Sequence, residues 1–66
     1  MQIQLNGQAR EIASGTPLAA LLEAAGYAGR KVAVEVNLEV VPRSQHASHV
    51  LAEGDRVEII HAIGGG

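Results

Sequence analysis

One short amphipathic helix is the feature that most limits how this chain can fold. The stretch TPLAALLEAAGY, residues 16–27, carries apolar side chains at intervals of three and four residues: Leu18, Leu21, Leu22 and Ala25. That spacing gathers them on one stripe of an α-helix. A helix with a single apolar stripe needs a surface to pack on, and the segments on both sides of it have the patterns of strands. We therefore expect the helix to lie on one face of a sheet.

The two ends of this helix have signals of their own. Thr16 is the expected N-cap, and Pro17 is the expected first helical residue, where a missing N–H costs nothing. Gly26 suits the left-handed position that ends a helix. The sequence thus predicts a helix of about two to three turns.

Before the helix, the sequence predicts a β-hairpin. Residues 1–5, MQIQL, alternate apolar and polar side chains, which is typical of a strand with one buried face. Asn6-Gly7 follows, and both residues tolerate the positive φ of a type I′ turn. The returning strand is expected from Gln8 to about Ile12.

After the helix, β-branched residues indicate more strands. In VAVEV, residues 32–36, the alternate valines share one face. Residues 37–39 are expected to turn into a short strand at Val40-Val41, which Pro42 ends. Residues 43–55 are expected to be mostly connection, with one irregular helical turn at most.

The last strand begins at Arg56 and reads RVEIIHAI. If its side chains alternate, Val57 and Ile59 point toward the helix and Ile60 lies on the uncovered face of the sheet. This strand is strongly apolar, so we expect it in the middle of the sheet, parallel to the first strand.

These segments give the order β-β-α-β-β-β. A single helix that covers a small mixed sheet is an α+β fold. We divide the chain into one domain, residues 1–63, and a flexible glycine tail, residues 64–66.

Composition narrows the classes of function. The chain has no cysteine, a net charge of -2, and Tyr27 as its only aromatic residue. A thiolate metal site is thereby excluded, and nucleic acid is not an expected partner, because basic patches and stacking rings are missing. The first residues lack the features of a signal peptide, and no apolar run reaches membrane-spanning length. We expect a cytoplasmic protein with no membrane partner.

Candidate catalytic groups are few. His46 and His49 are three residues apart and could share a helical turn, but no further ligands complete a metal site. Ser44 and Ser48 stand beside these histidines, yet nothing orients a base for either hydroxyl. We interpret both histidines as surface residues and expect neither a bound metal nor an active site within the chain.

The remaining candidate is the tail itself, Gly64, Gly65 and Gly66. Terminal glycines can be structural slack. Alternatively, a backbone without side chains can pass through a narrow tunnel and carry its carboxylate into a closed site of a partner, where the carboxylate is activated. Three extended residues reach roughly 10 Å, which suffices to enter such a cleft while the domain stays outside.

Several stretches resemble a known family over essentially the full chain. They are MQIQLNGQ, TPLAALLEAAG, VAVEVNLEVVPRSQ and EGDRVEIIHAIGGG. They are similar to the β-grasp, or ubiquitin-like, superfamily and, within it, to the ThiS family of sulfur carriers in thiamine biosynthesis. Two positions depart from the family pattern: Asn37-Leu38 stands where Asn-Gly is usual, and His46 where an aromatic residue is common.

This resemblance implies a protein cosubstrate and not an enzyme. A ThiF-type adenylyltransferase would use ATP and Mg²⁺ to adenylate the carboxylate of Gly66. Sulfur from a cysteine desulfurase would convert it to a thiocarboxylate, which thiazole synthase (ThiG) would consume. Gly64 and Gly65 would enter the partner's site, and related proteins dock through an apolar patch at the place of Ile60. His61, five residues before the end, is either a further docking residue or a half-exposed strand residue. The chain itself would bind no cofactor.

Two other functions remain open from the sequence. The small subunit of molybdopterin synthase has the same terminal chemistry with a different acceptor. A ubiquitin-like module with an inert tail would act by docking alone.

Overall fold

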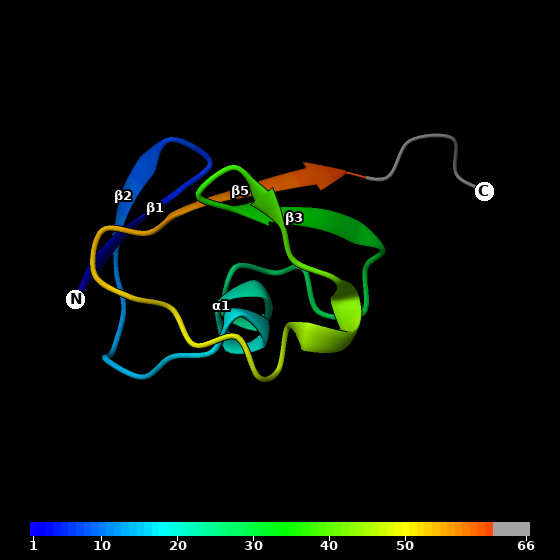
Figure 1. Cartoon of the computed structure of the whole chain (residues 1–66), viewed down its shortest axis with the longest axis horizontal. Helices are drawn as coiled ribbons and strands as arrows, with labels where there is room; N and C mark the ends of the chain where they lie inside the picture. The colour runs from blue at the N-terminus through cyan, green and yellow to red at the C-terminus, as the bar shows by residue number, and fades with distance from the viewer. Residues whose placement is uncertain (62–66) are drawn as a thin grey trace.

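The computed structural model describes residues 1–61, the last of these by its backbone only. Within this range the strands form a five-stranded mixed sheet in the order β2-β1-β5-β3-β4, and helix α1 lies against one face (Figure 1). The bounds are β1 Gln2–Leu5, β2 Gln8–Glu11, α1 Leu18–Ala24, β3 Val32–Val36, β4 Glu39–Val40, the 3₁₀ helix η1 Arg43–Gln45 and β5 Arg56–His61. The predicted α+β β-grasp fold is confirmed.

Strand β5 is central, as the sequence predicted. It pairs parallel with β1, where Leu5 lies beside Val57. On its other side it pairs antiparallel with β3, where Val34 lies opposite Ile59. The most apolar strands are therefore flanked on both sides, and Val34, Val36, Val57 and Ile59 are buried on the side of the helix.

The first hairpin has the predicted turn. Asn6 and Gly7 both have positive φ, 52° and 82°, and Leu5 pairs directly with Gln8. The returning strand ends at Glu11, within one residue of the expected end.

The second hairpin begins its returning strand one residue earlier than predicted. Asn37 and Leu38 form a two-residue turn, both with positive φ (53° and 71°). Val36 therefore pairs with Glu39, and β4 spans Glu39–Val40 instead of residues 40–41. Leu38 adopts this conformation although it has a Cβ, which normally disfavours it.

The predicted N-cap of the helix is wrong. Pro17 occupies the N-cap position and α1 starts at Leu18. The hydroxyl of Thr16 donates instead to the carbonyl oxygen of Ala13 at 2.6 Å, within the preceding turn. No side chain caps this end of the helix.

Backbone carbonyls of a distant loop take the place of that cap. The N–H of Leu18 donates to the carbonyl oxygen of His49 at 2.8 Å, and the N–H of Ala19 donates to that of His46 at 2.9 Å. The first donors of a helix have no partner within it, so an external acceptor satisfies them. The loop that follows η1 is thus fixed to the start of α1.

The core lies between α1 and the sheet. Its buried apolar residues are Ile3, Leu5, Leu18, Leu21, Leu22, Val34, Val36, Val41, Leu51, Val57 and Ile59. The predicted helical stripe is confirmed, with Ala25 partly buried beside it. Gly26 has a φ of 91° and ends the helix as expected. In the described part of the chain, no helix has the length and apolarity needed to cross a bilayer.

Candidate functional site

The candidate site begins where β5 leads to the glycine tail. Strand β3 pairs with β5 from Val57 through to its final residue, His61, which lies opposite Val32. The backbone is therefore held in the sheet up to this point. The predicted tail residues, Gly64, Gly65 and Gly66, lie outside the described residues.

Ile60 lies on the face of the sheet that the helix does not cover. Val57 and Ile59 are buried in the core, whereas Ile60 is 48% exposed, so the predicted alternation is confirmed. Ala33 lies opposite Ile60 across the β3–β5 pair. For His61, the other predicted docking residue, only the backbone within β5 is described.

The same face carries a second apolar position and two acids. Val40 is 66% exposed and lies opposite Glu35 in the β3–β4 pair. Glu35 in turn lies opposite Glu58 of β5. We call these five residues, Ala33, Glu35, Val40, Glu58 and Ile60, the outer-face patch.

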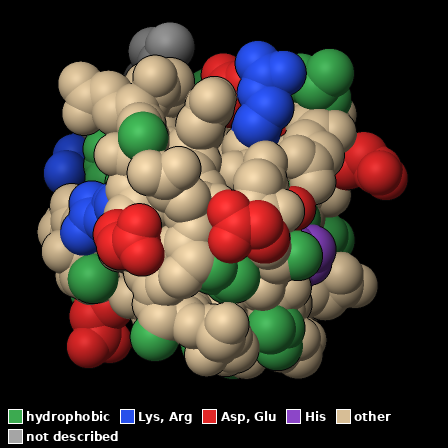
Figure 2. All heavy atoms as spheres, turned by 90° about the vertical axis from the view of Figure 1, so that its left-hand side faces the viewer, with side chains coloured by type: hydrophobic (Ala, Val, Ile, Leu, Met, Phe, Trp, Pro, Cys, Tyr) green, Lys and Arg blue, Asp and Glu red, His purple; other side chains and the backbone are tan. Residues whose placement is uncertain are grey.

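The end of the molecule that carries the N-terminus looks different. Acidic and basic side chains are interspersed there, and apolar side chains form only small separate areas (Figure 2). Such a mixed surface is typical of a solvated face. The outer-face patch is therefore the better candidate for docking.

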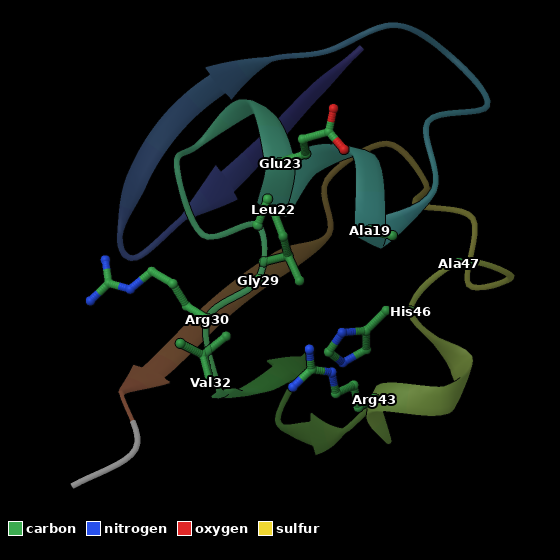
Figure 3. Close-up of a pocket in the computed structure, with 10 residues that line it drawn as sticks. Ala19, Leu22, Glu23, Gly29, Arg30, Val32, Arg43, His46 and Ala47 are labelled. Carbon is green, nitrogen blue, oxygen red and sulfur yellow. The ribbon is translucent and has the colours of Figure 1, made fainter. Parts of the chain in front are cut away.

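A hollow of about 300 Å³ lies between α1, the loop before β3 and the residues around η1 (Figure 3). Its polar lining residues do not converge. The side chains of Arg30 and Glu23 extend away from His46, and only Arg43 lies beside it. The guanidinium of Arg30 lies 5.5 Å from the ring centre of Tyr27. This arrangement brings no acid–base pair together.

The interpretation of His46 as a surface residue is wrong. It is 8% exposed, and its Nε2 lies 3.0 Å from the carbonyl oxygen of Val41, which accepts the hydrogen bond. A buried imidazole with a backbone partner is a structural element. Its burial follows from the loop contacts with α1, which the sequence did not reveal.

The other candidate catalytic groups do not form a site either. The hydroxyl of Ser48 donates to the carbonyl oxygen of Gln45 at 3.3 Å, and no histidine takes part. Among residues 1–61, no three metal-binding side chains come together.

Comparisons with known proteins add to this picture. The model of the ThiS family matches residues 3–66. The sulfur carrier protein ThiS of Escherichia coli is 36% identical over 66 residues, which cover all of both chains. The crystal structure of a ThiS thiamine biosynthesis protein from Geobacter metallireducens superposes with a TM-score of 0.86 at 32% identity, again over all of both chains.

Two longer relatives also match. Proteins named thiazole synthase from Magnetococcus marinus and Paramagnetospirillum magneticum are 47% and 44% identical over 66 residues. The chain spans only 20% of the length of each. The family match over nearly the whole chain, together with the end-to-end likeness of fold and sequence, shows that the chain belongs to the ThiS family.

Proposed function

We propose that this chain is a sulfur carrier of thiamine biosynthesis and that the carboxylate of Gly66 is its reactive group. The observation that carries the proposal is the family match, which extends through residue 66 and so includes the glycine tail. Of the two carrier pathways compatible with the sequence, a ThiS match supports thiamine over molybdopterin.

The proposed chemistry has three steps. The carboxylate oxygen of Gly66 attacks the α-phosphorus of ATP, and pyrophosphate leaves, which gives an acyl-adenylate. The terminal sulfur of a persulfide then displaces AMP, which gives an acyl disulfide with the donor cysteine. A thiol attacks the sulfur of that cysteine, forms a disulfide with it and releases the thiocarboxylate. The chain has no cysteine, so both sulfur species belong to partner proteins or to small thiols.

The fold supports the presentation of this carboxylate. Strand β5 is paired with β3 up to His61, so the tail is attached to a firmly held strand. Gly64 and Gly65 have no side chains that would block entry into a closed site, where water is excluded from the reactive intermediate.

The proposed partners follow from these steps. A ThiF-type adenylyltransferase supplies the site for ATP and Mg²⁺, and a cysteine desulfurase supplies the persulfide. Thiazole synthase (ThiG) is the proposed sulfur acceptor. In support, each of the two longer relatives named thiazole synthase contains a segment similar to all 66 residues of this chain. We place these reactions in the cytoplasm, where ATP and reduced thiols are supplied.

The chain acts in this proposal as a cosubstrate and not as a catalyst. Ile60 contributes to docking on the adenylating enzyme, and so does His61, the next residue in the sequence. Exposed single apolar residues are common, so the docking role depends on the patch as a whole.

Intact-mass measurement tests the proposal. The protein is incubated with the adenylyltransferase, ATP, Mg²⁺, a cysteine desulfurase with cysteine, and a thiol. We expect the mass to rise by the difference between one sulfur and one oxygen atom. An unchanged mass, with the same enzymes active on another ThiS protein, would support the docking module with an inert tail.

A further inference from the structure

Glu35 and Glu58 lie directly opposite each other on the uncovered face of the sheet. They are partners in the antiparallel β3–β5 register, so their side chains project from the same side. Glu35 is partly buried and Glu58 is exposed. Side chains that face each other in this way have Cβ atoms about 5 Å apart, and two like charges at that separation destabilise a sheet.

No ion pair in the described part of the chain includes either carboxylate. The ion pair found in residues 1–61 joins the N-terminus to Glu11 and involves neither of them. Arg56 is two residues before Glu58 and projects from the same face, but it forms no ion pair with either acid there. The fold does not require charged side chains at these two positions.

Apolar side chains lie beside the two acids on the same face. Val40 lies opposite Glu35, and Ala33 lies opposite Ile60 in the next row of the β3–β5 pair. Val40 is 66% exposed and Ile60 is 48% exposed. When a partner covers this apolar surface, dissolved salt screens a charged contact beside it less than it would screen one that is exposed to water.

We propose that Glu35 and Glu58 together bind one arginine or lysine side chain of the adenylating partner, with Val40, Ala33 and Ile60 as the apolar rim of the contact. A single cation between the two carboxylates converts a repulsive pair into two charge-assisted hydrogen bonds. This inference rests on the proposed function. It adds the residues by which the adenylating partner would recognise the chain.

The position of the pair fits this partner. Gly66 follows Glu58 by eight residues. At no more than 3.6 Å per residue, the Cα atoms of Glu58 and Gly66 are at most about 29 Å apart. A basic side chain bound by the pair would therefore hold the domain where the tail can still reach the nucleotide site.

The test compares Glu35→Gln, Glu58→Gln and the double variant with a matched control, Glu23→Gln. Glu23 is an exposed acid on α1, so the control removes the same charge from the opposite side of the sheet. The KM for the carrier, the kcat and the dependence of both on salt are measured in the adenylation reaction, and the melting temperature of each free variant is recorded.

We expect the double variant to raise KM by roughly tenfold or more at low salt, with little change in kcat, because complementary charges act on encounter and docking. The free double variant should melt about 1–5 °C higher than the wild type, since the repulsion is gone. Glu23→Gln should leave KM close to the wild-type value.

Three results would overturn the inference. They are a double-variant KM equal to that of Glu23→Gln, a lower melting temperature for the double variant, or a KM effect seen with thiazole synthase and not with the adenylating enzyme. Failure of the proposed function would look different, because the wild type itself would then not be adenylated.

Discussion

Asn37 and Asp55 join two turns that lie 18 residues apart in the sequence. The Nδ2 of Asn37 donates to Oδ1 of Asp55 at 2.9 Å, and the N–H of Arg56 donates to Oδ1 of Asn37 at 3.0 Å. One side chain in the β3–β4 turn thus fixes that turn to the start of β5. Because β5 leads to the tail, these hydrogen bonds contribute to fixing the strand from which the tail extends.

Replacement of Asn37 by glycine should destabilise the domain. Glycine tolerates the positive φ of this position, so the change removes both hydrogen bonds without adding backbone strain. We expect the free energy of unfolding to fall by about 1–2 kcal/mol, as measured by urea denaturation. Unchanged stability would show that the bridge between the turns contributes nothing.

Replacement of Leu38 by glycine should stabilise the domain. Leu38 has a φ of 71° and a side chain that is 75% exposed, so glycine relieves strain and loses little packing. We expect a gain of about 0.5–1 kcal/mol after the entropy cost of glycine is counted. Leu38→Ala is the control, because it shortens the side chain but keeps the Cβ. An equal gain in stability for Leu38→Ala would show that the effect comes from removing an exposed apolar side chain and not from relieving the positive φ.

His46 should matter more for stability than His49. His46→Ala removes a buried ring and leaves the carbonyl of Val41 without this partner, so we expect a loss of about 2 kcal/mol. His49 is partly exposed, and His49→Ala should cost less than about 1 kcal/mol. Thermal and urea unfolding of both variants measure the difference. Equal losses would contradict the structural role of His46.

Local patterns predicted most of this fold. Asn6-Gly7 specified its hairpin, the stripe that contains Leu21 specified the buried face of α1, and alternation in β5 placed Ile60 outward. Each of these signals acts over a few residues. The helical spacing and the strand spacing differ, so the two kinds of element were easily told apart.

What the sequence could not predict depends on contacts between distant residues. The helix begins after Pro17 because carbonyls of His46 and His49 receive its first N–H groups, and nothing near Thr16 in the sequence shows this. The facing of Glu35 and Glu58 follows from strand register, which is set only when β3 and β5 pair. Either glutamate alone resembles any exposed strand residue.

A substitution of Ile60 offers a separate test of the proposed docking role of the outer-face patch. Ile60→Thr keeps a β-branched side chain, so the strand should remain stable while the apolar contact is lost. We expect the KM for the carrier in the adenylation reaction to rise several-fold, or about 1 kcal/mol of binding, with kcat nearly unchanged.

Val50→Thr is the matched control for this variant. Val50 is 58% exposed and lies in a bridge with Pro17 at the start of the helix, away from the outer-face patch. Its substitution should leave KM unaltered. A KM that rises equally for both variants would indicate a general loss of folding and not a docking contact.

The most direct test of the central claim is fragment-ion mass spectrometry of the protein after the complete sulfur-transfer reaction. We predict that fragments containing Gly66 carry the added sulfur mass and that those ending before Gly66 do not. Oxidation of Met1 to the sulfoxide adds nearly the same mass, but at the opposite end of the chain, so the fragments separate the two products. Unmodified fragments at Gly66, with the wild type processed by active enzymes, would contradict the account.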